Sequence, residues 1–102
     1  MFGETKKATD NLLSLGYEYY SQERYMDALD ILSKAVKAAD KTHDDYTYIK
    51  SYVYIGNIYT IFDDYEQALH YYKKSLVKAY KLKDEKAITT AKCNMLLCYA
   101  NL

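Results

Sequence analysis

Few residues in this chain are of the types that build an active site. Its only cysteines are Cys93 and Cys98, and its only histidines are His43 and His70. The cysteines stand five residues apart in a segment of helical pattern, so their side chains point in different directions and cannot form a disulfide with each other. Neither histidine stands at a ligand spacing to a cysteine, and the sequence has no Gly-rich phosphate loop. We therefore predict no catalytic residue, no metal and no cofactor, and the chain is not expected to be an enzyme.

Charge argues against two further classes of partner. The chain of 102 residues has 14 basic and 14 acidic side chains, whereas nucleic acids and anionic membranes attract proteins with an excess of Lys and Arg. The charges are uneven: residues 1–64 carry a net −4 and residues 65–102 a net +4. An alternative is nucleic-acid binding, with tyrosines as stacking platforms and the lysines between Lys73 and Lys86 as a basic strip. Several of these tyrosines fall on core stripes, and the lysines fall mainly on an outer helix and the turn after it, so we predict no nucleic acid as partner.

The setting follows from what the sequence lacks. No window approaches the roughly 18 consecutive apolar residues of a membrane span, and residues at the N-terminus form no apolar signal core. Both thiols are expected to be reduced and packed as small hydrophobic side chains. We expect a cytoplasmic protein with no membrane contact.

An internal repeat organises the elements that would position a site. Gly16 and Gly56 are 40 residues apart, and the same step pairs identical residues at nine of the forty positions between residues 9–48 and 49–88. The chain contains no Pro and only three Gly, which favours helices over a β-rich fold. Apolar residues recur at i, i+3, i+4 and i+7 in each unit. This pattern predicts five helices, at about 5–22, 25–41, 45–62, 65–82 and 85–101.

The expected organisation is a single domain, residues 1–102, with repeats at 9–48 and 49–88 and a partial third at 89–102. Asp44–Asp45 and Asp84 stand where helix N-caps belong, because a short carboxylate can accept the unpaired N–H groups of a first turn. Gly16 and Gly56 are expected to let two helices approach closely, opposite Ala28 and Ala68.

The spacing Leu12-x-x-Leu15-Gly16-x-x-Tyr19, followed by Ala28, Leu32 and Ala35, resembles the tetratricopeptide (TPR) repeat. So does Tyr52-x-x-Ile55-Gly56-x-x-Tyr59, followed by Ala68, Tyr72 and Ser75. The unit is longer than the usual repeat of about 34 residues, and the usual Trp and closing Pro are absent. The resemblance implies an all-α, right-handed solenoid of antiparallel helix pairs, about two and a half repeats long. It also implies a protein–protein interaction module, a part of a larger signalling or scaffold protein.

The resemblance places a peptide-binding groove on the first helix of each unit. Beside the core stripe, the groove residues would be Asp10, Leu13, Tyr17, Tyr20, Lys50, Val53, Asn57, Thr60, Thr90, Cys93, Asn94 and Leu97. An alternative for Leu13, Val53 and Cys93 is contact with the helices of the next unit. The cations with which some TPR domains clamp a chaperone's C-terminal carboxylate are missing, and only Asn57 matches that set. The groove is therefore expected to hold an apolar or amphipathic segment of a partner.

A structural role is the alternative to peptide binding. The last predicted helix carries Cys93, Leu96, Leu97 and Ala100, which have no second helix to cover them within the sequence. We expect either that the protein continues beyond residue 102 or that a second copy covers this face. A homo-oligomer formed through residues 85–102 is the second hypothesis.

Overall fold

The computed structural model describes residues 6–102, which fold into helices joined by short turns. The helices are α1 (Lys6–Ser21), α2 (Tyr25–Thr42), α3 (Asp45–Ile61), α4 (Tyr65–Leu82) and α5 (Glu85–Ala100). No strand occurs in this stretch. Each predicted boundary agrees with the structure to within one residue, except that the predicted start at residue 5 lies outside the described residues.

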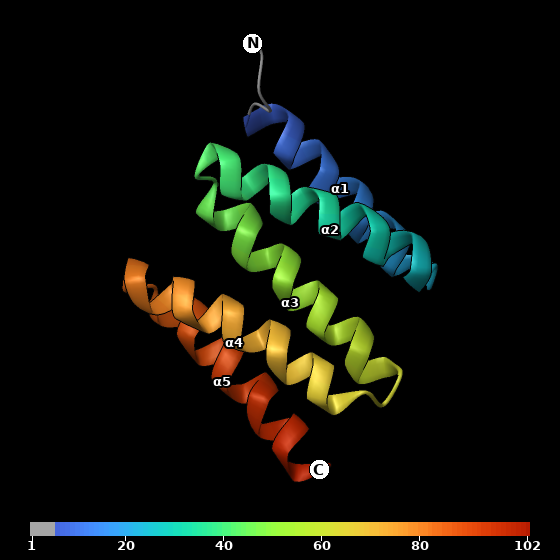
Figure 1. The fold of residues 1–102 in the computed structure, drawn as a ribbon, viewed down its shortest axis with the longest axis vertical. Helices are drawn as coiled ribbons and strands as arrows, with labels where there is room; N and C mark the ends of the chain where they lie inside the picture. Colours follow the sequence, from blue (N-terminus) through green and yellow to red (C-terminus); the bar gives the residue numbers. More distant parts are fainter. Residues whose placement is uncertain (1–5) are drawn as a thin grey trace.

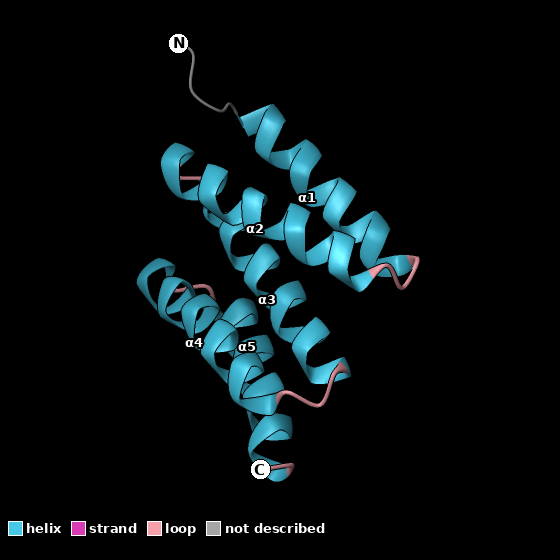
Figure 2. Ribbon diagram, turned by 45° about the vertical axis from the view of Figure 1, so that its right-hand side comes forward, coloured by secondary structure: helices cyan, strands magenta, loops and turns pink. Residues whose placement is uncertain are grey.

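The helices stack in chain order to form a helical solenoid (Figure 1). Short turns join α1 to α2 and α3 to α4, so that each pair forms a hairpin (Figure 2). Helix α3 also packs against α1, α2 and α5. The result is an elongated body with extents of 46 × 32 × 17 Å along its principal axes.

The turns repeat with the sequence. Glu23 and Asp63, which follow α1 and α3, have φ angles of 60°, and His43 and Lys83, which end α2 and α4, have φ angles of 57° and 56°. All four residues adopt the left-handed conformation that ends many helices, although none is glycine. Two turn geometries therefore recur at the 40-residue step.

Aspartates begin three of the helices. The carboxylates of Asp44 and Asp84 accept the N–H groups of Thr47, at 3.2 Å, and Ala87, at 3.1 Å. The predicted N-caps at Asp44 and Asp84 are thus confirmed. A third aspartate, Asp64, caps α4 in the same way.

The two repeat glycines seat one helix against the next, but not opposite the residues that the sequence suggested. A Cβ atom at Gly16 would lie 2.6 Å from the Leu32 side chain, and one at Gly56 would lie 2.5 Å from the Tyr72 ring. The nearest residues lie one helical turn beyond Ala28 and Ala68, so the predicted partners were wrong. The larger side chains fill the space that each glycine leaves.

The cysteines differ in their surroundings. Both are free, and Cys98 is fully buried whereas Cys93 is exposed. The expectation of a packed thiol is therefore confirmed for Cys98 and wrong for Cys93. Among residues 6–102, no helix is long and apolar enough to cross a membrane.

Candidate peptide-binding surface

Helices α1, α3 and α5 share one side of the solenoid. Helix α3 contacts both α1 and α5, whereas α2 and α4 do not contact each other in the described part of the chain. Successive helix pairs are therefore closest on the side of α1, α3 and α5 and splay apart on the other. This inner face is where the sequence placed its candidate groove.

Three tyrosines meet on the N-terminal half of the inner face. The Tyr54 ring of α3 lies 5.4 Å from the Tyr17 ring and 5.4 Å from the Tyr20 ring, both on α1. Burial raises the pKa of the Tyr54 hydroxyl, and the neighbouring Tyr17 adds to the effect. Tyr17 nevertheless remains 50% exposed. The structure thus brings the two predicted tyrosines together and leaves one ring open to a ligand.

Tyr54 was missed from the sequence although a signal was present. It stands four residues after Lys50 and three before Asn57, which places it on their helical stripe. The repeat alignment instead drew attention to Val53, because Val53 matches Leu13 at the 40-residue step. Tyr54 matches Ser14, a residue that gave no such signal.

Asn57 and Thr60 serve the α3–α4 hairpin as well as the inner face. The Tyr72 hydroxyl of α4 donates to the Asn57 side-chain carbonyl, and Thr60 Oγ1 lies 3.3 Å from the same hydroxyl. Burial raises the pKa of Tyr72 to about 12. Asn57 therefore has its carbonyl oxygen engaged, and only its amide nitrogen lacks a hydrogen-bond partner among residues 6–102. Asn57 therefore offers a ligand fewer hydrogen bonds than its position in the sequence indicated.

Two of the three apolar groove candidates contact the helices of the next unit, which was the alternative considered for them. Leu13 packs against a core cluster that includes Ile55 of α3, and Val53 packs against one that includes Ile88 of α5. Both side chains therefore join one helix pair to the next. Cys93 is exposed, so the alternative does not apply to it among the described residues.

The remaining candidates lie towards the two ends of the inner face. Asp10 is half exposed and forms an ion pair with Lys6 at 3.5 Å. On α5, Thr90 is exposed, Asn94 is partly buried and Leu97 is 62% exposed. The structure does not gather these residues into one compact site.

An open pocket of about 450 Å³ lies where α3 meets α5 and the turn before α5. It contains three of the predicted groove residues, Lys50, Val53 and Thr90. The others are Tyr46, Ile49, Leu82, Asp84, Lys86 and Ala87. We call this place the C-terminal junction.

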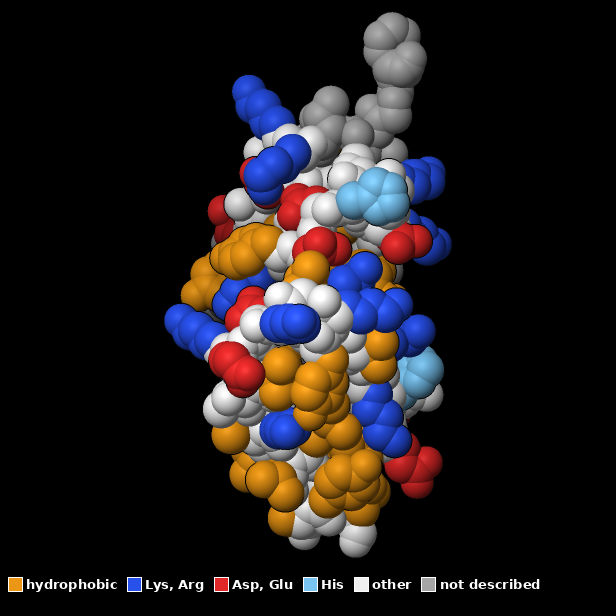
Figure 3. Space-filling view, turned by 90° about the vertical axis from the view of Figure 1, so that its left-hand side faces the viewer, with side chains coloured by type: hydrophobic (Ala, Val, Ile, Leu, Met, Phe, Trp, Pro, Cys, Tyr) orange, Lys and Arg blue, Asp and Glu red, His pale blue; other side chains and the backbone are white. Residues whose placement is uncertain are grey.

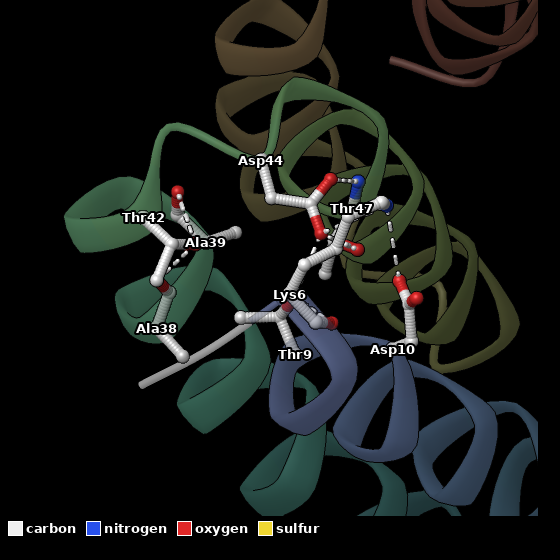
Figure 4. A network of polar contacts seen from close by, with 8 residues as sticks. All are labelled: Lys6, Thr9, Asp10, Ala38, Ala39, Thr42, Asp44 and Thr47. Atoms are coloured by element: carbon white, nitrogen blue, oxygen red, sulfur yellow. Dashed lines mark hydrogen bonds and ion pairs between the residues drawn. The ribbon is translucent and has the colours of Figure 1, made fainter. Parts of the chain in front are cut away.

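The corresponding place between α1 and α3 is closed by a polar network, which we call the N-terminal junction (Figure 4). Asp44 accepts hydrogen bonds from the hydroxyls of Thr9 at 2.7 Å and Thr47 at 2.8 Å. Lys6 Nζ lies 3.8 Å from the same carboxylate, whose side chain is only 6% exposed. Burial would raise the pKa of Asp44, but the hydrogen bonds and the Lys6 charge outweigh it and hold that pKa below its usual 3.8.

Most of the basic strip lies on α4, on the outer side of the solenoid, whereas Lys83 follows α4 and Lys86 lies on α5. Lys78 forms an ion pair with Asp45 at 3.5 Å and its Nζ lies 4.7 Å from the centre of the Tyr48 ring. Lys74 lies over the Tyr52 ring at 5.8 Å. Two of the lysines are thus already engaged by the protein itself. Within residues 6–102, no group of three His, Cys, Asp or Glu side chains could hold a metal ion.

Comparison with known proteins agrees with this architecture. A search of curated proteins finds no match. The family model of the tetratricopeptide repeat matches residues 8–76, a span from α1 into α4. Members of this family are generally protein–protein interaction modules and are typically not catalytic. Because the match covers more than half of the sequence, the chain belongs to the tetratricopeptide repeat family.

Proposed function

We propose that the chain holds an apolar or amphipathic segment of a partner protein along the inner face of α1, α3 and α5. The observation that carries this proposal is the cluster of Tyr17, Tyr20 and Tyr54, which joins two helix pairs and leaves Tyr17 half exposed. An aromatic side chain of this kind offers a large contact area at low entropic cost. Lys50 supplies a charge on the same face of α3.

The setting is part of the same proposal. Holding a partner segment without catalysis suits a module within a larger signalling or scaffold protein. Two unpaired cysteines support a reducing, cytoplasmic compartment.

Selection from a phage-displayed library of random peptides tests this proposal, because such a library samples many sequences and assumes no particular partner. The selected peptides are titrated into the isotope-labelled chain, and the shifted amide signals are mapped by NMR. We expect the shifts on α1, α3 and α5. Shifts confined to α2 and α4, or a library that yields no binding peptide, would overturn the proposal.

A variant identifies the anchor. Tyr17→Ala should weaken the selected peptides by at least about 1 kcal/mol if this ring is a hot spot. Met26→Ala is the matched control, because Met26 is also a large exposed side chain, 72% exposed, but lies on α2. It should leave the affinity unchanged, and circular dichroism should show that both variants remain folded.

A specific observation also favours self-association. Leu96, Leu97 and Tyr99 of α5 are 68%, 62% and 53% exposed. Figure 3 shows hydrophobic side chains gathered over this C-terminal end of the molecule. A second copy that covers α5 would remove this surface from water, and the association would be mainly hydrophobic.

Light scattering tests the second candidate. We expect a dimer or larger species that persists at high salt, because exposed ion pairs contribute less than about 1 kcal/mol each. Leu97→Lys should yield a monomer. A monomer of the unmodified chain at high protein concentration would reject self-association.

A further inference from the structure

We infer that the C-terminal junction is a specificity pocket for an apolar side chain flanked by carboxylates in the bound segment. This inference rests on the proposed function, because the pocket lies between the same inner helices, α3 and α5. Its volume of about 450 Å³ lies within the range of ordinary ligand pockets. Three features of the pocket define the chemistry of its occupant.

The first feature is an apolar floor. Ile49 and Val53 of α3 and Ala87 of α5 line the pocket and belong to one hydrophobic cluster. Ile49 is nearly buried, whereas Val53 and Ala87 are only partly covered. An aliphatic or aromatic side chain of a partner would complete the burial of these groups.

The second feature is unbalanced positive charge. Lys50 and Lys86 line the pocket, and neither forms an ion pair within the described chain. Among the described residues, the lining contains one acid, Asp84, which accepts the Ala87 N–H group as the N-cap of α5 and keeps its negative charge. Two cations and one carboxylate leave the pocket with a net positive charge, which favours a carboxylate beside the apolar side chain of the ligand.

The third feature is that the corresponding residues of the N-terminal junction do not form the same apolar, basic lining. At the 40-residue step, Thr9 of the N-terminal junction corresponds to Ile49. In the same way, Thr47 corresponds to Ala87. The two hydroxyls that hold Asp44 are thus replaced by hydrocarbon around Asp84.

The remaining substitutions reverse the charge and remove an internal partner. Lys6, which lies beside Asp44, corresponds to Tyr46, and Asp10 corresponds to Lys50. The repeat geometry is kept, but the groups that closed the first junction are absent from the second. The second junction is therefore left open to an external ligand, and its lining is apolar and basic.

Three blocked peptides of equal length test the inference directly. Each has a central leucine, flanked by glutamates, glutamines or lysines, and each is titrated into the labelled chain by NMR. The glutamate peptide should shift the amides of Ile49, Val53 and Ala87 and bind about three- to tenfold more tightly than the glutamine peptide. The lysine peptide should bind most weakly, and high salt should remove the differences.

Two variants assign the effect to the pocket. Lys50→Gln combined with Lys86→Gln should abolish the preference for glutamate but retain the weak binding of the glutamine peptide. Lys34→Gln combined with Lys37→Gln removes two exposed lysines from α2 and should preserve the preference. Ala87→Leu should fill the pocket and weaken all three peptides.

The outcomes separate this inference from the proposed function. Equal binding of the glutamate and glutamine peptides, or no detectable binding of any of the three, would overturn the specificity pocket. Binding of library-selected peptides beside Tyr17 would then leave the proposed function standing. A preference for glutamate that survives the Lys50 and Lys86 substitutions would also overturn the pocket.

Discussion

The two junctions of the inner face have the same backbone plan and opposite chemistry. At the N-terminal junction, Asp44 is enclosed by Thr9, Thr47 and Lys6, and its side chain is only 6% exposed. At the C-terminal junction, Asp84 caps a helix in the same way but is exposed beside an open pocket. The comparison teaches that repeat geometry places a junction, whereas a few side chains decide whether the protein itself fills it or leaves it open.

The polar network at the N-terminal junction connects helices that are distant in the sequence. Thr9 lies 35 residues before Asp44, and the bond between their side chains ties the first turns of α1 to the start of α3. A buried carboxylate is tolerated there because each partner offsets part of its desolvation. Among the described residues, no such hydrogen-bond network connects the helices at the C-terminal junction.

The largest expected effect tests whether the two helix pairs have equivalent backbones. Gly56→Leu should destabilise the chain by about 1–3 kcal/mol, because the added side chain meets the buried Tyr72 ring. Gly16→Leu should cost less, since Leu32 is more flexible than a ring. Chemical denaturation measures both. An unchanged stability of Gly56→Leu would break the alignment on which the comparison rests.

The next effect concerns the hydrogen-bond network around Asp44 at the N-terminal junction. Thr9→Val combined with Thr47→Ala removes both hydroxyl donors and should lower the free energy of unfolding by about 1–3 kcal/mol, because a buried carboxylate loses two of its hydrogen-bond donors. Thr89→Val, at an exposed position of α5, is the matched control and should change little. A double variant as stable as the unmodified chain would show that the network does not stabilise the packing of α1 against α3.

A smaller effect appears in the pH dependence. Because the pKa of Asp44 is lowered on folding, its ionised form stabilises the chain above the unfolded pKa of about 3.8. This contribution is lost as the pH falls below that value and through the folded pKa. Denaturation measured from neutral to acidic pH should therefore show a decline that is reduced in the double threonine variant. Parallel curves for the two proteins would contradict this assignment.

The smallest effect is expected at the open junction. Lys50→Gln combined with Lys86→Gln should change the free energy of unfolding by less than about 0.5 kcal/mol, since both side chains are exposed. A large loss of stability would show that these lysines serve the fold and would weaken the case for a ligand.

Much of the fold could be predicted because its signals are local. The stripes set by residues such as Leu15 and Tyr19 gave the helix boundaries, and Asp44 and Asp84 gave two of the caps. Of the tyrosine cluster on the inner face, Tyr17 and Tyr20 were named as candidates from the sequence. Tyr54 was missed, and the engagement of Asn57 by Tyr72 was not foreseen, because both depend on which helix lies opposite.

The sequence by itself determined the five helices within residues 6–102, their 40-residue step and two of the caps that begin them. Periodicity and first-turn hydrogen bonds involve residues close along the chain. Only the tertiary structure decided which side chains meet across that step. Thr9 and Asp44 close the N-terminal junction, whereas Ile49 and Ala87 line the open pocket of the C-terminal junction. Yet Asp44 and Asp84 cap their helices in the same way. Whether such a place is filled or open depends on side chains from separate helices, and the chain brings these together only when the helices pack.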